Sequence, residues 1–447
     1  MKKTFHRGGI HPDPCKITAG MPVRPLPPAA ELRIILSQCI GAPSRPVVKT
    51  GDIVRRGQML AEAGGFVGAP IHSPCAARVV KTERVRNAQG LWQEAMVLQR
   101  LTPEELEERP GYDAWPTPRT PEEVAALSPA QIIGIVGESG IVGLGGATFP
   151  TRVKLTVPEG KRAWVVVVNA AECEPYLTCD DQLMRACPEE IIKGVELLMR
   201  ATGAPQGIIG IESNKPKSAE RLKGAAEKSD ADITVQLLRT RYPQGGEKQL
   251  IEALTGRQVP LGGLPIDAGA IVDNVATVYA VYEAVYLRRP LTRRIVTVTG
   301  PDVTYAGNYM VDNGTSISDL IETAGGLPAD TGKIIAGGPM MGHAVSQPNA
   351  PVTKGTSGIV MLPEKLSRRQ PEKPCIRCAK CVSTCPMGLQ PYLLMTLSKM
   401  RLAPEVRAEG VMNCMECGCC AYTCPSARPI VDYIRLGKQL VRALPRE

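Results

Sequence analysis

The order of apolar and polar stretches in the middle of the chain predicts alternating strands and helices. Apolar runs at residues 164–168, 207–211 and 233–238 have the length and composition of buried strands. Residues 188–200, which lie between the first two runs, place apolar side chains at helical spacing. Strands and helices in alternation indicate an α/β layer.

A helix followed by a glycine-rich loop precedes this layer. Ser128 suits an N-cap and Pro129 suits the first helical position, and Ile132, Ile133 and Val136 share one face. The loop after the helix, residues 140–154, is not a Rossmann fingerprint, because it follows a helix and has a threonine where that motif has its third glycine. Its glycines still allow backbone amides to approach a phosphate or a flat ring. A tight structural turn is the alternative interpretation.

Three polar loops in the same region could converge on one ligand. They are residues 169–176, 241–250 and 271–277. The first follows a predicted buried strand, and open α/β sheets bind ligands beyond the carboxyl ends of their strands.

The first hundred residues contain short strands, turns and many prolines. Residues 1–30 are predicted to have little secondary structure and to lie across other domains. Between residues 47 and 74, a Gly-Asp-Ile-Val-Arg-Arg-Gly-Gln segment and a later Ala-Pro resemble the biotinyl/lipoyl barrel-sandwich fold. Carriers of that fold have a lysine at the hairpin tip, whereas residues 63–66 here are Ala-Gly-Gly-Phe. We therefore expect a structural module, followed by a polar linker at residues 102–121.

Two cysteine runs carry the most specific signal in the chain. Residues 375–386 and 414–425 each read C-x2-C-x2-C-x3-C-P, the bacterial ferredoxin pattern, in which the fourth cysteine of a run ligates the other [4Fe–4S] cluster. Structural zinc usually pairs two C-x2-C knuckles instead. Cys419 does not fit the spacing and is predicted not to be a ligand. The predicted ligand sets are Cys375, Cys378, Cys381 and Cys424 for one cluster, and Cys414, Cys417, Cys420 and Cys385 for the other.

Composition indicates the cellular compartment of the protein and the classes of partner to expect. The 447 residues suffice for about three domains, and 15 cysteines without a signal peptide indicate a reducing, cytoplasmic setting. No apolar run approaches the roughly 20 residues that cross a bilayer. The net charge is +9, and residues 365–447 hold 14 Lys and Arg against 6 Asp and Glu. No basic stripe alternates with aromatic residues, so nucleic acid is not expected as a partner.

The last predicted helix, residues 430–444, places apolar side chains on one face and Arg435, Lys438 and Arg442 largely on the other. The cations could form a docking surface for an acidic protein or an anionic membrane. Alternatively, the helix packs on the cluster domain and its cations are a solvated face.

Taken together, these motifs resemble a known family. Gly145-Gly-Ala-x-Phe-Pro-Thr-x-x-Lys154, Asn169-Ala-x-Glu-x-Glu-Pro175, residues 242–250 and Asn274-Val-x-Thr277 occur in the same order as in the FMN- and NADH-binding subunit of respiratory complex I. With the Gly-Gly-Ile-His-Pro start, the lysine-less barrel-sandwich segment and the twin cysteine runs, essentially the whole chain is similar to the C subunits of Rnf complexes. It departs from the complex I pattern at Leu144, Ala171 and Cys173, where arginine, aspartate and serine are usual.

The resemblance implies a multidomain α/β and α+β fold. It comprises an N-terminal segment with a barrel-sandwich hybrid (1–120), a Rossmann-like FMN/NADH domain of the complex I flavoprotein type (121–290), a β-grasp module of the SLBB type (291–362) and a helical, ferredoxin-type domain with two [4Fe–4S] clusters (363–447). It also implies site residues. FMN would be bound by Gly143, Gly145, Gly146, Lys154, Asn169, Glu172, Asn274 and Thr277. Phe149 would lie against the dinucleotide, and the nicotinamide would be oriented by the catalytic pair Glu174 and Glu247.

The function implied is that of a NADH/NAD-binding subunit of a membrane-bound, ion-translocating ferredoxin:NAD oxidoreductase. The subunit would exchange hydride between NAD(H) and FMN and pass single electrons to partner subunits, with ferredoxin as an indirect partner. Its expected location is peripheral, on the cytoplasmic face of the inner or plasma membrane. A soluble cobalamin reductase of similar architecture is one alternative, and an electron-transfer adaptor without bound flavin is another.

Overall fold

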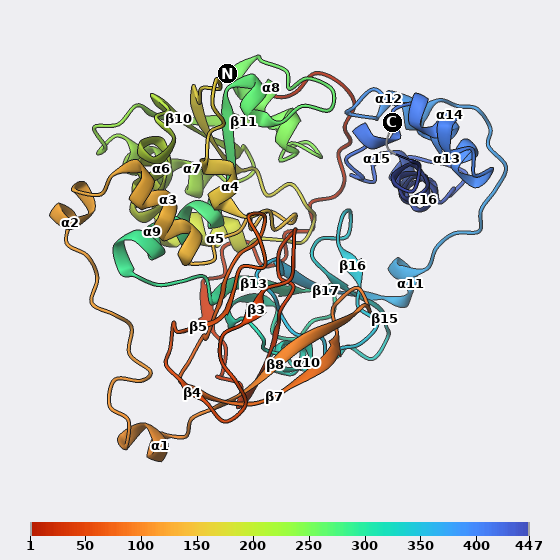
Figure 1. Cartoon of the computed structure of the whole chain (residues 1–447). Coiled ribbons are helices and arrows are strands. Elements are labelled where there is room, and N and C mark those ends of the chain that lie inside the picture. The colour runs from red at the N-terminus through yellow and green to blue at the C-terminus, as the bar shows by residue number, and fades with distance from the viewer. Residues whose placement is uncertain (1, 446–447) are drawn as a thin grey trace.

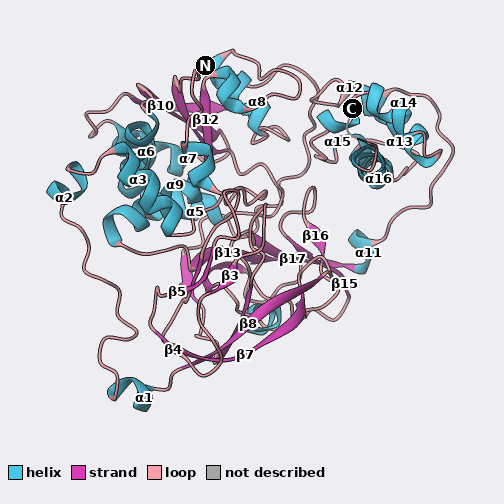
Figure 2. Cartoon of the chain, in the orientation of Figure 1, coloured by secondary structure: helices cyan, strands magenta, loops and turns pink. Residues whose placement is uncertain are grey.

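The computed structural model describes residues 2–445 and contains four sheets and one all-helical region (Figures 1 and 2). In Figure 1 the blue C-terminal helices stand apart at the upper right, and the red N-terminal segment runs between them and the green and yellow α/β layer. In the described part of the chain, no helix combines the length and apolar character that crossing a membrane requires.

The barrel-sandwich region consists of two small antiparallel sheets. One has the order β2-β8-β7-β4 and the other β3-β5-β6. Leu32, Leu60, Val79 and Leu98 contribute to the core between them. The strands are β2 (Glu31–Ile35), β3 (Arg45–Pro46), β4 (Ile53–Val54), β5 (Met59–Glu62), β6 (Ile71–His72), β7 (Ala77–Arg86) and β8 (Trp92–Arg100). The polar linker that follows contains α1 (Pro103–Glu107) and leads to α2 (Pro121–Ala125).

The α/β layer is a four-stranded parallel sheet in the order β11-β10-β9-β12. Its strands are β9 (Val165–Ala170), β10 (Gln206–Glu212), β11 (Ile233–Leu238) and β12 (Ala270–Asn274). Side chains along β9 alternate between two cores. Val166 and Val168 pack toward α3 (Pro129–Glu138), α6 (Pro188–Thr202), α7 (Pro216–Ala226) and α9 (Val275–Leu287), whereas Val165 and Val167 face α8 (Glu247–Thr255).

The predicted elements of this layer are confirmed with small shifts of their ends. Ser128 caps α3 by accepting from the Gln131 amide at 3.3 Å, and Pro129 is its first residue. Trp164, which was predicted as the first strand residue, lies outside β9 and is 42% exposed. Its ring faces the Arg162 guanidinium at 4.1 Å and that of Arg257 at 5.9 Å.

The β-grasp region forms a mixed sheet in the order β1-β14-β13-β17-β15-β16, with α10 (Ile317–Thr323) packed on it. Five strands come from one segment: β13 (Arg293–Thr299), β14 (Gly307–Asp312), β15 (Thr331–Ala336), β16 (His343–Ala344) and β17 (Gly358–Pro363). The sixth, β1 (Val23–Pro25), belongs to the N-terminal segment and pairs in parallel with β14. This pairing confirms that the first 30 residues lie across other domains.

The region after α11 (Glu364–Ser367) contains helices and loops. Its helices are α12 (Lys380–Ser383), α13 (Pro391–Lys399), α14 (Ala403–Ala408), α15 (Cys419–Tyr422) and α16 (Ile430–Arg442). Ile430 and Ile434 of α16 pack on Leu394 and Val406, so the last helix belongs to the core of this region.

The alternative in which α16 packs on the cluster domain is confirmed, and two of its three cations are paired within the chain. Lys438 is only 8% exposed, and its ammonium donates to the Cys414 carbonyl and to Glu416 at 2.7 Å. Arg435 donates to the same carboxylate at 2.9 Å. Only Arg442 of the three cations is exposed. The other two are used within the chain because the helix turns that face toward the second cysteine run.

A buried lysine joins three regions. The ammonium of Lys354, which is 1% exposed, donates to the Pro70 carbonyl of the barrel-sandwich region and to the Gly140 carbonyl of the α/β layer, both at 2.7 Å. Burial lowers the pKa of Lys354 to about 8. The neighbouring titratable groups are Cys39, whose pKa burial raises, and His72, whose pKa burial lowers to about 3.

We predict that Lys354 makes stability rise with pH above 8. Between its folded pKa of about 8 and its usual value of 10.5 the unfolded chain binds more protons, so deprotonation favours the folded state. Urea unfolding should show the lysine protein gaining about 2–3 kcal/mol relative to Lys354→Met between pH 7 and pH 10. Both proteins carry Cys39→Ser, which removes the neighbouring thiol. Parallel pH profiles would contradict the prediction.

Candidate functional site

The candidate site lies at the carboxyl edge of the parallel sheet, where the strand order reverses. The chain passes from β9 to β10 to β11 on one side and returns to the other side of β9 with β12. Ligands of open α/β sheets bind at this kind of switch point. Asn169, the penultimate residue of β9, and Asn274, the last residue of β12, are register partners, so both lie at the same edge.

The glycine loop is held against this edge by side chains of β12 and α9. The Leu144 amide donates to the Thr277 hydroxyl at 2.8 Å. A Cβ on Gly145 would stand 3.3 Å from the Asn274 Cβ, so a larger residue would push the loop away. The loop closes on itself between Gly143 and Phe149, with the Gly143 amide donating at 2.8 Å.

The tip of the glycine loop is open. Gly145, Gly146 and Ala147 are exposed, and their amides make no hydrogen bond within the described residues. Exposed, unused amides in a glycine loop are donors that suit a phosphate or ring carbonyls. The half-buried Phe149 stands at the base of the loop.

A group of charged residues lies beside the loop. The Lys154 ammonium donates to the Val272 carbonyl at 2.7 Å and lies 3.3 Å from Glu247 and 3.9 Å from Asp273. Although burial disfavours its charge, the two carboxylates raise the pKa of Lys154. Asp273 is fully buried, neither carboxylate oxygen has a hydrogen-bond partner, and burial raises its pKa to about 6 against the opposing charge of Lys154. Asp273 belongs to none of the predicted site residues, although a lone carboxylate at the end of an apolar strand was a usable signal.

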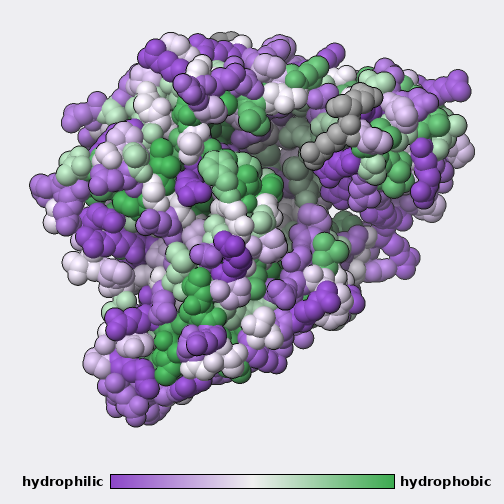
Figure 3. Space-filling model, in the orientation of Figure 1, coloured by the Kyte–Doolittle hydropathy of each residue, from purple (hydrophilic) through white to green (hydrophobic). Residues whose placement is uncertain are grey.

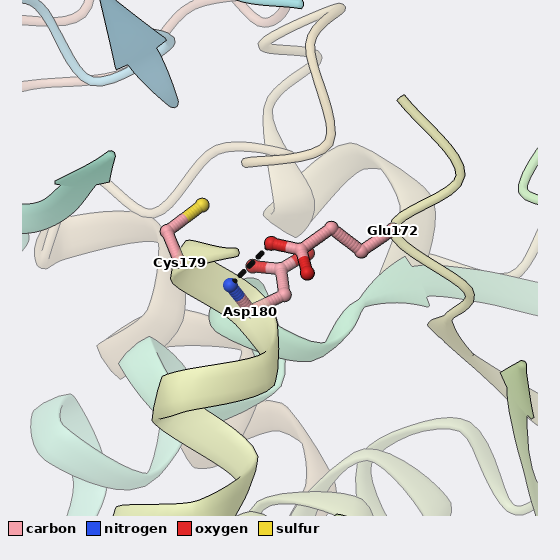
Figure 4. Close-up of side chains that lie close together, drawn as sticks. All are labelled: Glu172, Cys179 and Asp180. Atoms are coloured by element: carbon pink, nitrogen blue, oxygen red, sulfur yellow. Dashed lines mark hydrogen bonds between the residues drawn. The ribbon is translucent and has the colours of Figure 1, made fainter. Parts of the chain in front are cut away.

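Glu172 stabilises the start of a helix. In Figure 4 its carboxylate reaches over α5 (Cys179–Ala186), where it accepts from the Asp180 amide at 2.7 Å and, at 3.3 Å, from the Asp181 amide. Its ligand atoms and those of Cys179 and Asp180 all lie within 4.8 Å of one another. The Asp180 carboxylate accepts from the Asn274 side chain at 2.7 Å, which ties α5 to the end of β12. This cluster is therefore part of the scaffold under the glycine loop.

Asn169 connects the strand edge to the loop at residues 241–250. Its side chain donates to the Gly245 carbonyl at 2.8 Å, and its oxygen accepts from the Ala171 amide at 3.1 Å. The departures from the complex I pattern are accommodated locally. Leu144 and Ala171 are buried in apolar cores, and the Cys173 sulfur accepts from the Gly245 amide at 3.4 Å.

Glu174 points away from the open loop tip, toward the β-grasp and cysteine regions. One oxygen accepts from the Met340 amide at 3.0 Å, and the other is buried with no hydrogen-bond partner in the described part of the chain. Burial raises the pKa of Glu174 to about 7. The two glutamates predicted as a catalytic pair therefore have different neighbours: Glu247 lies beside Lys154, and Glu174 contacts the Met340 amide.

The N-terminal segment orders the loop after β9. The ammonium of Lys16 donates to the carbonyls of Glu172, Glu174 and Leu177 at 2.6–2.9 Å. No sequence motif predicts this role of Lys16, because its carbonyl partners lie more than 150 residues away in the chain.

The site is directly connected to the second cysteine run. The Tyr242 hydroxyl donates to the Cys417 carbonyl at 2.8 Å, and the Met415 methyl lies 2.8 Å from where a Cβ on Gly246 would stand. Gly8 of the N-terminal segment inserts between the two regions, and the Gly9 amide donates to the Thr384 carbonyl at 2.8 Å.

The cysteines fall into two groups in space. Cys385 crosses to the second run, where it joins Cys414, Cys417 and Cys420 around a cavity that Val431 and Ile434 of α16 also line. Burial and the charges of neighbouring thiols in this group raise the pKa of Cys414 and Cys420, and burial and the charges of Cys424 and Cys375 raise the pKa of Cys381. Cys378, which lies between Cys375 and Cys381 in the sequence, is exposed. This arrangement of soft sulfur donors fits two iron–sulfur clusters. The buried Cys419 lines the same cavity next to Cys417.

Comparison with known proteins matches this architecture. Family descriptions match in chain order: "RnfC Barrel sandwich hybrid domain" at residues 3–100, "Nuo51 FMN-binding domain" at 136–283, "SLBB domain" at 295–344 and "4Fe-4S dicluster domain" at 368–425. The chain is 41% identical to the C subunit of the proton-translocating ferredoxin:NAD(+) oxidoreductase complex of Clostridium ljungdahlii, over 99% of this chain and 95% of that one.

The chain belongs to the family of these C subunits. It is also 39% identical to the C subunit of the Na(+)-translocating ferredoxin:NAD(+) oxidoreductase complex of Acetobacterium woodii, over 100% of this chain and 99% of that one. A solved structure of an NAD+-reducing [NiFe]-hydrogenase in the air-oxidised state superposes with a TM-score of 0.50 at 21% identity, covering 78% of this chain and 74% of that one. That likeness concerns the fold. The predicted multidomain fold class, with an FMN-binding domain and an iron–sulfur dicluster domain, is confirmed.

We predict that Gly8→Ala separates the N-terminal segment from the cysteine region. Gly8 has φ +66°, and a Cβ would stand 2.5 Å from the backbone carbon of Cys385. The expected cost is about 1–3 kcal/mol, measured as a lower free energy of unfolding and as faster tryptic cleavage after Arg7. Gly51→Ala is the matched control, because its φ of +95° is equally unfavourable but its Cβ would meet nothing within 4 Å. Equal effects of the two substitutions would contradict the prediction.

Proposed function

We propose that this chain is the NAD(H)-binding flavoprotein iron–sulfur subunit of a membrane-bound, ion-translocating ferredoxin:NAD oxidoreductase. The observation that carries the proposal is the open glycine loop at the switch point of the sheet, joined through Tyr242 to a cysteine run. The match to C subunits over the whole chain supports it and disfavours a cobalamin reductase. We also propose a peripheral position on the cytoplasmic face, assembled with the other subunits, and domain boundaries near residues 120, 290 and 362.

FMN fits the residues at the switch point. The exposed amides of Gly145 and Gly146 would donate to it, and Lys154 would supply positive charge. Gly143, Asn274 and Thr277 hold the loop in place, while Asn169 and Glu172 maintain the strand end and α5 beneath it. Bound flavin supplies conversion between a two-electron hydride and single electrons.

We assign recognition of the nicotinamide to Glu247 rather than to Glu174. Its side chain is 42% exposed beside Lys154, so its carboxylate can reach a second ligand. Glu174 is enclosed beneath Met340, and we assign it to holding the boundary between the nicotinamide side and the cysteine region. Phe149 would lie against the dinucleotide at the base of the glycine loop.

Two groups of thiolates would hold the clusters. Cys375, Cys378, Cys381 and Cys424 form the first set, and Cys414, Cys417, Cys420 and Cys385 the second. Each set combines three cysteines of one run with the fourth of the other, as in two-cluster ferredoxins. The spatial grouping of Cys385 with the second run supports this pairing.

Anaerobic purification followed by flavin and iron analysis, with a titration by NADH, tests the proposal. Bound FMN, roughly eight iron atoms per chain and bleaching by NADH are expected for two [4Fe–4S] clusters beside a flavin. A protein that holds iron but no flavin even after incubation with FMN would instead be an electron-transfer adaptor.

We predict different defects for Lys154→Met and Glu247→Gln. Loss of the ammonium removes a charge-assisted partner of FMN, so flavin occupancy should fall and added FMN should restore it. Glu247→Gln should raise the KM for NADH about tenfold at normal flavin content, measured with ferricyanide as acceptor. Lys248→Met is the control, since its ammonium donates only to the Pro260 carbonyl on the exposed side of α8. If Glu247→Gln leaves the KM unchanged, the nicotinamide assignment is wrong.

We predict that Cys385→Ser damages the cluster of the other run. The Cys385 thiol stands with Cys414, Cys417 and Cys420, so its loss should remove the cluster held there and leave the first one. Iron content should fall by about half, with one cluster signal retained in EPR spectra. Cys419→Ser is the matched control in the same cavity, and both clusters should survive it. Loss of iron in the control would make Cys419 a ligand.

A further inference from the structure

A buried ion group touches only one of the two cysteine runs. The Lys438 ammonium donates to the Cys414 carbonyl and, at 2.7 Å, to Glu416, while Arg435 donates to the other oxygen of Glu416 at 2.9 Å. The side chain of Lys438 is 11% exposed and that of Glu416 is 27% exposed. Glu416 stands inside the run, directly before Cys417.

The first run differs at the matching position. Arg377 precedes Cys378 as Glu416 precedes Cys417, and both residues have left-handed backbones, with φ of +54° and +59°. Arg377 is exposed and makes no ion pair within the described residues, and Cys375 and Cys378 are exposed as well. The two runs thus share their backbone but differ in electrostatic surroundings. Beside the first cluster set, Arg428 pairs with Glu372 at 3.6 Å, but within the runs a cation is buried only next to the second, where the Lys438 side chain is 11% exposed.

The group formed by Lys438, Arg435 and Glu416 carries a net positive charge. Two cations face one carboxylate, and Glu416 is the only acidic partner of Lys438 and Arg435 in the described part of the chain. His343 of β16 lies near Arg435 and Glu416, but burial and Arg435 lower its pKa, so it adds no charge at neutral pH. Charges interact more strongly where solvent is excluded, so the charge of Lys438, with an 11% exposed side chain, acts on the nearby cysteines with less screening than that of Arg435, with a 41% exposed one.

We propose that Lys438 is a positioning residue whose buried charge raises the reduction potential of the cluster held by Cys385, Cys414, Cys417 and Cys420 above that of its twin. The proposal rests on the two-cluster assignment made above. A cation next to a cluster stabilises its more negative, reduced form, and net charge and hydrogen bonding are main determinants of cluster potential. The affected cluster is the one joined to the flavin domain through Tyr242.

The test is an EPR-monitored redox titration of the full-length, anaerobically purified protein, fitted to two midpoints. Lys438→Met should lower one midpoint, changing the oxidised-to-reduced ratio of that cluster on the order of tenfold at a fixed potential, which corresponds to about 59 mV for one electron. Lys438→Arg keeps the charge and should restore the midpoint. Glu416→Gln removes the negative charge and should raise the same midpoint. Lys399→Met is the control, because this lysine is exposed on α13 and contacts only the Tyr433 ring.

The opposite shifts of Lys438→Met and Glu416→Gln distinguish an effect of charge from damage to the fold. Shifts in the same direction, equal shifts of both midpoints or no shift would overturn the proposal. If Lys438→Met loses iron, the Glu416→Gln variant tests the proposal alone. A raised midpoint then supports the proposal, and an unchanged or lowered midpoint overturns it. Wild-type protein that contains fewer than two clusters would instead refute the cluster assignment, which iron analysis reports separately.

Discussion

The contact between the loop at residues 242–246 and the second cysteine run is the interaction on which the arrangement of this molecule depends. Tyr242 is 1% exposed, and its hydroxyl is satisfied by the Cys417 carbonyl. A buried phenol without a partner would be costly, so the side chain favours the arrangement in which the helical region docks here. In Figure 3, a hollow separates the cysteine region at the upper right from the rest of this face. The connection includes specific contacts of Tyr242, Gly8 and Met340 and an apolar cluster around Tyr242 and Cys419.

Buried charges organise the parts of the chain that regular secondary structure does not. Lys16 draws three carbonyls of the loop after β9 together, Lys354 joins two regions to the β-grasp segment, and Lys438 fixes the start of the second cysteine run. Each ammonium satisfies backbone carbonyls that have left the sheet or helix ladder, which is where buried acceptors need partners. The flexible stem of lysine lets one side chain reach acceptors from several segments.

The site combines rigid and open parts. Thr277, Asn274 and Asp180 fix the base of the glycine loop through hydrogen bonds of 2.7–2.8 Å, while its tip keeps free amides in solvent. Preorganised donors of this kind need little rearrangement when a ligand binds. The carboxylate of Asp273 is ion-paired with Lys154 at 3.9 Å but has no hydrogen-bond partner among the described residues, so its acceptor capacity at the floor of the site is not used up by the fold.

The sequence alone determined the elements and the chemistry. Helical and strand periodicity located α3, α6, β10 and β11, because these depend on local spacing of apolar residues, and the two cysteine runs specified iron–sulfur ligation through spacing alone. Only the tertiary structure decided which residues meet. It turned Lys438 and Arg435 of α16 inward to Glu416, although amphipathic spacing suggested an open basic face, and it sent Glu174 toward Met340 while Glu247 stayed with Lys154. The roles of Lys16 and Lys354 depend on partners more than 150 residues away, and no local pattern encodes a contact that exists only after distant segments pack together.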